Sequence, residues 1–415
     1  MRNIYTSIDI GSESIKIVVL EFIRDKFHVL AKTSVNSVGV KRGVIVDFDM
    51  ALNSLRLALD EIKKTLGTSI TKAIVCIPSN DRELSIASSS IEINNDVIEK
   101  EDIGRLLFEV SKDKKEGYEL VSVIPIVFKI DGDKYLIDPL NYNSSSLFVK
   151  AVLAFAPKKN VFDILKLVNS ANVECVDITF NCIGDYYEAK TNDTENSLGA
   201  IINIGYEKTD ISLFNKGILI KNSMVPLGSK NIDKDISYIY RVDLNTSKEL
   251  KEKFSSSTRR FADINESIEF NLSENEKISV NQYEITDIVE ARISEILKLA
   301  KKEINNLTKR KISYIIVTGG ITELMGFSYV VENILGINSS CLMSNTIGVR
   351  NNKYSSSIGV IKYYHEKINL RGEYLPFFDD DGIYEMNNNI DSALELTDDV
   401  FTSKIFGYLV TKEGM

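Results

Sequence analysis

The sequence predicts an α/β protein with two lobes, each built around one sheet. A strand-turn-strand unit over residues 7–20 returns over residues 201–214 with the same pattern of polar and β-branched residues. The order strand, strand, strand, helix, strand that opens the chain also recurs after residue 199. At 415 residues, the chain is longer than one hydrophobic core usually serves. We therefore expect two similar halves, each with its own core.

Each repeated unit ends its first strand on a short polar side chain, and a glycine follows two residues later. Asp9 and Gly11 hold these positions in the first unit, and Asn203 and Gly205 hold them in the second. Glycine allows the backbone to come close to a ligand. We expect the two turns to hold one phosphate chain from opposite sides.

The first half continues with strands and helices on either side of an insert. The segment from residue 82 to about 155 differs in composition from its surroundings, and we interpret it as an inserted α+β subdomain. The other expected elements are strands over 27–34 and 73–78 and helices over 47–66, 161–170 and 182–189.

The second half repeats the strand order and adds a long helical region. Apolar residues recur at helical spacing over 282–308, and the polar segment 255–279 before it is expected to be a hairpin or loop. The other expected elements are strands over 199–204, 209–214, 217–227 and 312–318, and the segment 231–254 is expected to be helical.

The end of the chain differs from both halves. Residues 371–399 are rich in Asp and Asn and show little periodicity, which predicts a flexible linker. The following residues place Phe401, Ile405, Tyr408 and Leu409 at i, i+4, i+7 and i+8, the spacing of an amphipathic helix.

Composition limits the possible functions. The net charge is −9, with 50 basic and 59 acidic residues, which argues against nucleic-acid binding as the main role. Four cysteines without a C-x-x-C pair and only two histidines argue against a zinc site. The sequence has neither a secretory signal nor a run of ~20 apolar residues. We expect a reduced protein that stays in the cytoplasm unless something docks it to a surface.

The first turn carries residues suited to a phosphate and its metal. Asp9, at a strand end beside a glycine turn, is placed to hold a hydrated Mg²⁺ on phosphate oxygens. Gly11, Ser12 and Ser14 offer backbone and hydroxyl donors, and Lys16 on the returning strand adds a positive charge. The alternative is a glycine turn that only closes a hairpin at a sheet edge.

A third glycine turn favours the nucleotide interpretation. The buried strand over 312–318 runs into Gly319 and Gly320 and then into a helix, so backbone amides at the helix start would face a ligand. Alone, the paired glycines are also typical of a tight strand-to-helix turn. Three such turns in two matching halves are a much more specific signal than any one of them.

Together these motifs resemble the actin, hexokinase and heat-shock-chaperone superfamily. Residues 9–12 are similar to its first phosphate loop, 202–209 to its second, 318–322 to its adenosine loop, and 356–360 to its second connecting element. The resemblance implies that ATP binds between two lobes.

Within that superfamily the chain resembles FtsA, a family of bacterial division proteins. The inserted subdomain, the segment 123–130 followed by Asp138-Pro139, the turn at 225–228, and the linker with its terminal helix carry this resemblance from Ile4 to Leu409. It implies a two-lobed actin-like (ribonuclease-H-like) fold with an inserted α+β subdomain and a C-terminal amphipathic helix. The implied domains are subdomain IA at 1–81 and 158–197, inserted subdomain IC at 82–157, subdomain IIA at 198–228 and 312–370, helical subdomain IIB at 229–311, a flexible linker at 371–399, and a membrane-targeting helix at 400–415.

The resemblance also implies a set of residues that bind ATP and Mg²⁺, with Asp9 on the metal and no catalytic residue assigned. These residues are Asp9, Gly11, Ser12, Ser14, Lys16, Asn203, Gly205, Tyr206, Lys208, Thr209, Gly228, Lys251, Gly319, Gly320 and Ile321.

The second loop departs from the commoner pattern of the superfamily. Asn203 stands where an acidic residue is usual, and Tyr206 and Glu207 stand where the superfamily has more glycine. Lys251 fits the adenosine region, whereas Lys248 falls where an acidic residue is usual. An amide holds a metal-bound or attacking water less firmly than a carboxylate, so we expect ATP binding with slow or absent hydrolysis.

The terminal helix has the composition of a membrane anchor. Its expected lipid-facing residues are apolar or aromatic, and a lysine would meet anionic headgroups. Because one short helix binds weakly, several on a polymer would be needed for firm attachment. The alternative is a helix that docks on the protein's own core. The expected membrane-binding residues are Phe401, Lys404, Ile405, Phe406, Tyr408 and Leu409.

The FtsA resemblance implies a polymerising, ATP-binding protein that tethers FtsZ filaments to the inner face of the cell membrane at the division septum, as a peripheral membrane protein. It implies an FtsZ C-terminal tail on subdomain IIB, contacts with other divisome proteins, and no nucleic-acid partner. The alternatives are a PilM-like protein of type IV pilus assembly, a small-molecule kinase of the same superfamily, and a cytosolic chaperone or shape-determining filament. Asn203 argues against the kinase, because no carboxylate stands out as a catalytic base.

Overall fold

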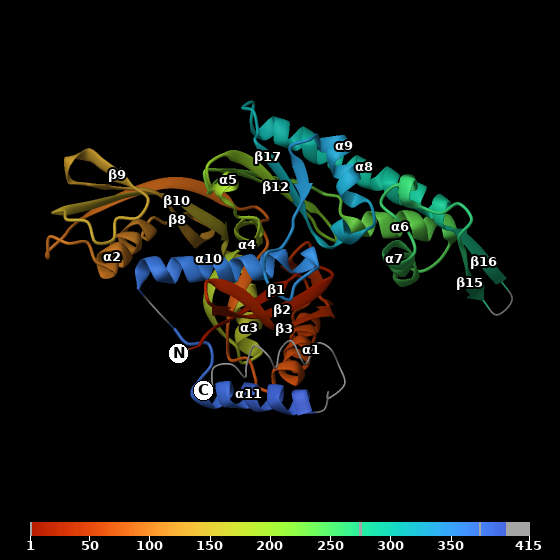
Figure 1. The fold of residues 1–415 in the computed structure, drawn as a ribbon, viewed down its shortest axis with the longest axis horizontal. Helices are drawn as coiled ribbons and strands as arrows, with labels where there is room; N and C mark the ends of the chain where they lie inside the picture. The colour runs from red at the N-terminus through yellow and green to blue at the C-terminus, as the bar shows by residue number, and fades with distance from the viewer. Residues whose placement is uncertain (1, 274–275, 373–374, 396–415) are drawn as a thin grey trace.

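Two lobes with matching sheets form the body of the protein (Figure 1). The computed structural model describes residues 2–273, 276–372 and 375–395. Each lobe has its own hydrophobic core, as the chain length predicts. The predicted two-lobed α/β fold class is confirmed.

Lobe I contains a five-stranded mixed sheet in the order β3-β2-β1-β6-β11. Strands β1, β2 and β3 pair antiparallel, and β1, β6 and β11 pair parallel. The strands are β1 (Asn3–Ile10), β2 (Ser14–Ile23), β3 (Lys26–Asn36), β6 (Lys72–Ile77) and β11 (Glu174–Phe180), and the helices packed on them are α1 (Phe48–Leu66) and α3 (Lys158–Ser170). A small hairpin of β4 (Val40–Lys41) and β5 (Val44–Ile45) precedes α1.

Lobe II repeats this topology strand for strand, in the order β14-β13-β12-β17-β18. The first three strands again pair antiparallel and the last pairs are parallel, so the predicted repeat of whole sheets is confirmed. The strands are β12 (Leu198–Ile204), β13 (Thr209–Asn215), β14 (Ile218–Val225), β17 (Tyr314–Thr318) and β18 (Ser339–Cys341); α5 (Asn192–Glu195) leads into this sheet and α9 (Phe327–Leu335) packs beside it.

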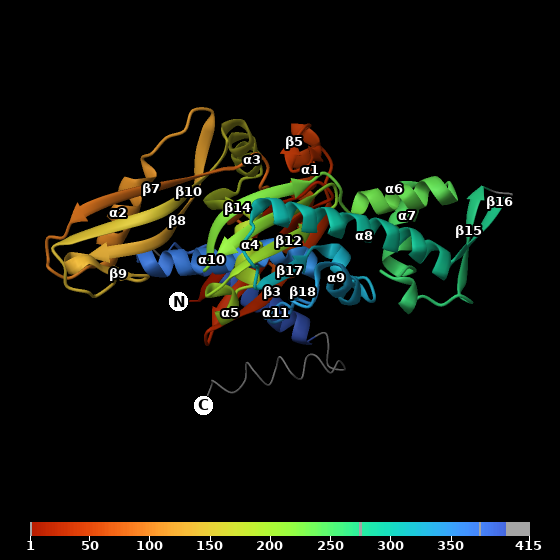
Figure 2. The same cartoon turned by 90° about the horizontal axis from the view of Figure 1, so that it is seen from above.

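The insert projects from lobe I as a separate α+β subdomain (Figures 1 and 2). Its antiparallel sheet has the order β7-β10-β8-β9, and its core includes the fully buried Phe128, Leu147 and Val149. Its elements are β7 (Glu83–Glu92), α2 (Lys100–Ser111), β8 (Tyr118–Ile130), a 3-10 turn (Asp131–Asp133), β9 (Lys134–Leu136) and β10 (Ser146–Pro157).

A helical arm extends from lobe II on the side away from the insert (Figure 2). It contains two short helices, a hairpin and one long helix, and the hairpin confirms the interpretation of the polar segment before the long helix. The elements are α6 (Ser229–Tyr240), α7 (Leu244–Lys253), a 3-10 turn (Arg259–Phe261), β15 (Ser267–Ser273), β16 (Glu276–Asn281) and α8 (Gln282–Leu307).

The segment 231–254 is helical as predicted, but it forms two helices, because the chain breaks between α6 and α7. Arg241 ends α6 in the left-handed conformation, with φ +54°, which an α-helix does not continue through. Asp243 then caps α7, since its carboxylate accepts hydrogen bonds from the backbone of Asn245 at 2.8 Å and Thr246 at 3.0 Å.

Two helices connect the lobes and cross at a pair of glycines. They are α4 (Asn181–Glu188) and α10 (Ser355–Arg371), the latter containing the predicted second connecting element. A Cβ on Gly359 would lie 1.7 Å from the carbonyl oxygen of Gly184, and a Cβ on Gly184 would lie 2.3 Å from that of Ser356. Only glycine permits this approach, so the backbones themselves meet where the lobes join.

The predicted flexible linker over 371–399 is wrong in its described part, which contains α11 (Asp380–Glu395). Phe377 and Met386 are almost fully buried against lobe I, with 2% and 1% of their surface exposed. The Asn389 side chain also donates a hydrogen bond to the carbonyl oxygen of Thr65, at 2.9 Å. The acidic and Asn-rich composition obscured these few apolar residues, which are enough to anchor the segment beside α1.

We expect Phe377→Ala to loosen this anchor. The Phe377 ring packs edge-on against Tyr5 and Tyr364, with ring centroids 5.6 and 5.7 Å apart, and its removal would leave a cavity. The free energy of unfolding of lobe I, from urea denaturation, should fall by about 3–5 kcal/mol. Tyr384→Ala, on the same segment but 68% exposed, is the control and should change it little. Equal losses in both variants would contradict the docked position.

Candidate functional site

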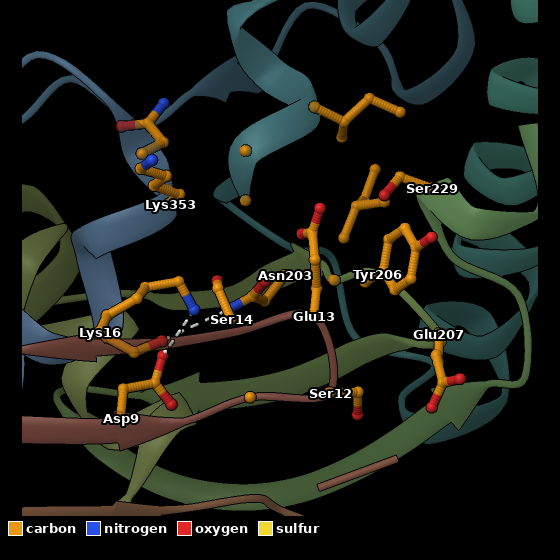
Figure 3. Close-up of a pocket in the computed structure, with 18 of the residues that line it drawn as sticks. Asp9, Ser12, Glu13, Ser14, Lys16, Asn203, Tyr206, Glu207, Ser229 and Lys353 are labelled. Atoms are coloured by element: carbon orange, nitrogen blue, oxygen red, sulfur yellow. Dashed lines mark hydrogen bonds and ion pairs between the residues drawn. The ribbon is translucent and has the colours of Figure 1, made fainter. Parts of the chain in front are cut away.

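A cleft of about 490 Å³ lies between the lobes, where loops from both come together (Figure 3). The turns after β1, β12 and β17 line it, together with the start of α10 and one face of α7. These are the three glycine turns that the sequence analysis singled out, brought together by the repeated topology.

The first two turns have the same backbone geometry. Gly11 donates a hydrogen bond from its backbone to the carbonyl oxygen of Ser14 at 3.1 Å, and Gly205 donates the equivalent bond to Lys208 at 3.0 Å. Both glycines therefore close a tight strand-turn-strand unit, which confirms that the sequence repeat is also a structural one.

The second turn rests on the N-terminus of α6. The backbone amides of Ser229 and Lys230 donate to the carbonyl oxygens of Gly205 and Tyr206, at 2.9 and 2.8 Å. Ser229 itself lines the cleft. The partial positive charge of a helix N-terminus thus lies next to this wall of the cleft.

The third turn lies directly against the second. Gly319 has φ +110°, and a Cβ at this position would lie 2.3 Å from the carbonyl oxygen of Ile204 at the end of β12. The chain then forms a 3-10 turn (Gly320–Glu323) in place of the expected α-helix. A second 3-10 turn (Asn352–Tyr354) precedes α10 on the facing side.

Asp9 and Lys16 form an ion pair at the floor of the cleft (Figure 3). They are opposite each other on β1 and β2, and Lys16 Nζ lies 3.1 Å from Asp9 Oδ2. Burial alone would lower the pKa of the Lys16 ammonium, but the charges of Asp9 and Glu13 outweigh it and raise that pKa. Lys16 therefore stays charged at neutral pH.

Lys353 is a further cation in the cleft, and no motif in the sequence pointed to it. Partial burial, reinforced by the charge of Lys16, lowers the pKa of the Lys353 ammonium. Lys353 makes no ion pair with any residue that the structure describes. The Lys16 charge thus makes the charged form of Lys353 less favourable, and a bound anion would offset this effect.

Most of the predicted nucleotide-binding residues line the cleft, and two do not. Thr209 is fully buried behind it, where its hydroxyl donates to the carbonyl oxygen of Leu227 at 2.8 Å. Gly228 also lies outside the lining, next to the turn it supports at the start of α6. The predicted residues that do line the cleft are Asp9, Gly11, Ser12, Ser14, Lys16, Asn203, Gly205, Tyr206, Lys208, Lys251, Gly319, Gly320 and Ile321.

Two predicted lysines are already paired with carboxylates. Lys208 Nζ lies 2.7 Å from Asp210, and Lys251 Nζ lies 2.6 Å from the fully buried Asp233. Their charges are largely neutralised. Lys16 has a partner too, Asp9, so among the lysines that line the described cleft only Lys353 is without an ion pair.

Five acidic side chains besides Asp9 line the cleft, and the sequence assigned none of them as a catalytic base. Most are engaged: Asp210 pairs with Lys208, Glu207 with Lys230, and Glu13 with Lys248. Sequence spacing could not show this, since two of the three pairs join residues far apart in the chain. The five are Glu13, Glu207, Asp210, Glu252 and Glu323.

The lobes contact each other across the cleft at several points, one of them the hydrogen bond that Lys208 donates to the Asn80 side chain. Glu13, from the first turn, pairs with Lys248 on α7, and the Glu207 carboxylate of lobe II accepts a hydrogen bond from the backbone of Arg42 at 2.7 Å. Lys248 stands where the family pattern is usually acidic, and here it pairs with Glu13 of the opposite lobe.

A buried carboxylate lies behind Asn203. Asp185 of α4, only 1% exposed, accepts hydrogen bonds from the Asn203 amide at 2.6 Å, Ser355 at 2.8 Å and Ser356 at 2.7 Å. Burial raises the pKa of the Asp185 carboxyl to about 6, the Asp9 charge adds to this, and the three hydrogen bonds oppose it. No pattern in the sequence pointed to Asp185.

The described residues were also searched for metal-binding clusters and membrane-spanning helices. Within the described ranges, no group of three or more His, Cys, Asp or Glu side chains is arranged to hold a metal ion. None of the helices described is long and apolar enough to cross a bilayer. The predicted membrane-binding residues, Phe401 to Leu409, lie outside the described residues.

Comparison with protein families gives two matches. Residues 200–359 match the sequence model of cell division protein FtsA, and residues 83–154 match that of the SHS2 domain inserted in FtsA. The second match covers β7 to β10 and so identifies the inserted subdomain.

Individual relatives match over most of the chain. The cell division protein FtsA of Bacillus subtilis is 28% identical over 382 residues, covering 91% of this chain and 87% of that protein. FtsA of Enterococcus hirae is 25% identical, covering 86% of this chain and 82% of that protein. The predicted resemblance to FtsA is confirmed.

Solved structures confirm the actin-like fold. A chain of the PilM-PilN type IV pilus biogenesis complex superimposes with a TM-score of 0.58 at 14% identity, covering 86% of this chain and 98% of that one. MreB5 of Spiroplasma citri bound to ADP superimposes with a TM-score of 0.55 at 12% identity, covering 89% of this chain and 99% of that one. At these identities the likeness is one of fold.

The raised pKa of Asp185 predicts a specific pH dependence of stability. The folded protein retains this proton up to about pH 6, whereas the unfolded chain loses it near the ordinary value of 3.8. The contribution of Asp185 to stability is therefore fully present below pH 3.8 and is lost as pH rises through 6. Relative to Asp185→Asn, the wild-type free energy of unfolding should fall by about 3 kcal/mol between pH 4 and pH 7. Parallel curves for the two proteins would contradict this.

Proposed function

We propose that this relative of FtsA is an actin-like protein of bacterial cell division that binds ATP with Mg²⁺, polymerises, and tethers FtsZ filaments to the inner face of the cell membrane at the septum. The observation that carries the proposal is the cleft, which is lined by two glycine turns of equivalent backbone geometry, one from each lobe, and by Lys16 and Lys353. The FtsA matches supply the cellular role, and the fold is that of proteins solved with nucleotide.

The cleft suits a polyphosphate in three ways. The three glycine turns bring backbone within reach of a ligand, and Ser12 and Ser14 add hydroxyl groups. The N-terminus of α6 adds a partial positive charge beside the second turn. Lys353 lines the cleft without an ion-pair partner in the described part of the chain, and phosphate charge would offset the effect of the Lys16 charge on it.

Asp9 would hold the metal. It is a single carboxylate at the cleft floor with one oxygen held by Lys16, which fits a hydrated Mg²⁺ bound mainly through phosphate and water. When bound, the ion would neutralise phosphate charge. The chain's own part is to orient the ion's water shell through Asp9 and the neighbouring amide of Asn203.

The proposed consequence of binding is a change in lobe arrangement. Lobe-to-lobe contacts such as Glu13 with Lys248 and Glu207 with Arg42 come from the turns that would hold the phosphates. A nucleotide that binds both lobes favours the arrangement in which both turns contact it. We propose that this arrangement is the one that joins a filament.

The helical arm is the proposed site for the acidic FtsZ tail. Of the basic residues on α8, Arg292 pairs with Asp235 at 2.7 Å, and Lys301 donates to the carbonyl oxygen of Ile334 at 2.6 Å. Lys298 and Lys302 are exposed and make no ion pair within the described part of the chain. These two lysines are the better candidates for contact with an acidic peptide.

Asp9→Ala should abolish most of the effect of Mg²⁺ on ATP binding. Without the carboxylate the ion loses its protein ligand, while Lys16, freed from its partner, still attracts phosphate. The gain in ATP affinity on changing from EDTA to MgCl₂, measured by calorimetry, should fall roughly tenfold. Asp60→Ala, an exposed position on α1, is the control. An unchanged gain would show that Asp9 does not hold the metal, and a wild-type protein that binds no ATP would refute the nucleotide function.

The tethering role predicts that the chain links a peptide to a membrane. Full-length protein should sediment with phosphatidylglycerol-containing vesicles and carry a labelled FtsZ-tail peptide with it. Residues 1–399 should bind the peptide but stay in the supernatant, because the proposed membrane contact is removed. Lys298→Glu with Lys302→Glu should weaken peptide capture several-fold without changing sedimentation.

A PilM-like role predicts a different result. The full-length protein would then neither sediment with vesicles through residues 400–415 nor capture the peptide. The fold likeness to PilM would then be a better guide to the function than the FtsA matches.

A further inference from the structure

The orientation of the Asn203 amide is set from behind, by Asp185. An ionised carboxylate can only accept hydrogen bonds, so the NH₂ group of Asn203 must point toward it. The two are 2.6 Å apart, and Asn203 Nδ2 also lies 3.4 Å from the Ser356 hydroxyl. Both interactions use the donor side of the amide. The carbonyl oxygen of Asn203 is therefore the atom left to face the cleft, which Asn203 lines.

Among the described residues, every side-chain hydrogen bond of Asp185 is one that its carboxylate accepts. Its Oδ2 accepts from Asn203 and its Oδ1 accepts from the hydroxyls of Ser355 and Ser356. Its side chain does not line the cleft and makes no ion pair among the described residues. A buried carboxylate without a cation is costly, and the three groups that donate hydrogen bonds to it stabilise its charge.

The three donors come from segments that meet only at the junction of the lobes. Asn203 ends β12, Ser355 and Ser356 begin α10, and Asp185 follows Gly184, where α4 touches α10. The Ser355 hydroxyl in turn contacts Thr318, at the end of β17, at 2.9 Å. The network thus fixes Asn203 relative to the helices that connect the lobes.

We propose that Asp185 is a positioning residue that holds the Asn203 amide with its carbonyl oxygen toward the cleft, as an acceptor for the water shell of a phosphate-bound cation. This inference rests on the proposed function, and it deepens it. The second turn has an amide, Asn203, in place of a carboxylate, and the negative charge lies behind it on Asp185 of α4. Asp185 acts on the cleft through the carbonyl oxygen of Asn203, whose direction it fixes.

The pairing predicts which substitutions are compatible. In Asp185→Asn the new NH₂ faces that of Asn203, so the Asn203 amide would turn over and present a donor to the cation. In Asn203→Asp two carboxylates would lie in contact in a buried position, which is strongly unfavourable. The double variant Asp185→Asn with Asn203→Asp exchanges the two groups. Its amide at position 185 would still accept from the serines through the oxygen, while the nitrogen donates to the carboxylate at position 203.

The test compares these three variants with the full-length wild type in two measurements. The first is thermal stability without nucleotide. Asn203→Asp should unfold at the lowest temperature, and the double variant should regain most of the loss. The second is the affinity for ATP in MgCl₂ and for ADP in EDTA. Asp185→Asn should bind ATP with Mg²⁺ roughly tenfold more weakly, with ADP in EDTA nearly unchanged.

Glu188→Gln is the matched control. Glu188 lies one turn further along α4 and is equally buried, but it contacts Lys362, Ser344 and Thr346, away from the cleft. It should lower stability without changing the ratio of the two affinities. If Asp185→Asn behaves like Glu188→Gln, Asp185 is merely structural and the inference is wrong.

The stability measurement separates this inference from the proposed function. If the wild type binds no nucleotide, the proposed function fails, yet the double variant still decides whether Asp185 orients Asn203. If the double variant is no more stable than Asn203→Asp, the two side chains do not act as a pair, and the inference fails even in a protein that binds ATP.

Discussion

The close contact between Gly184 and Gly359 is the constraint on which the rest of the structure depends. It brings the backbones of α4 and α10 together, and these helices carry the junction between the lobes. Because no side chain separates them, the ends of β1 and β12 come near enough for their turns to form one cleft. A larger residue at either position would move the helices apart and widen the cleft from its base.

The charges in the cleft are arranged in pairs, and this arrangement determines what the cleft can bind. Most acidic residues in the lining are matched with a lysine, which leaves Lys16 and Lys353 as the cations best placed to meet a ligand. Lys16 balances Asp9, whereas Lys353 has no such partner among the described residues. A polyphosphate with its metal would bring charge of both signs to this group, so each charged side chain at the floor of the cleft would have a partner of opposite sign.

Sequence alone predicted the features that depend on neighbouring residues. The strand-turn-strand repeat, the glycine turns and the position of the insert are local patterns, and each holds in the structure. The interaction of Asp185 with Asn203 could not be predicted in this way, since α4 and β12 come together only through the folding of both lobes. Lys353 was missed for the same reason. The docking of α11 was missed because Phe377 and Met386 are sparse in a segment that is otherwise acidic and polar.

Asn203 shows why a site residue has to be interpreted with its neighbours. Considered alone, an amide in place of a carboxylate indicates a turn that has lost its charge and holds a cation weakly. In the structure that amide donates to a carboxylate at 2.6 Å, so the charge is still present and acts through an oriented dipole. Under the proposed function, such an arrangement would hold a water shell at a fixed position but place less negative charge beside the phosphates than a direct carboxylate would. A cleft of this kind would then favour retaining a nucleotide over hydrolysing it, because an attacking water would meet an acceptor without a full charge to take its proton.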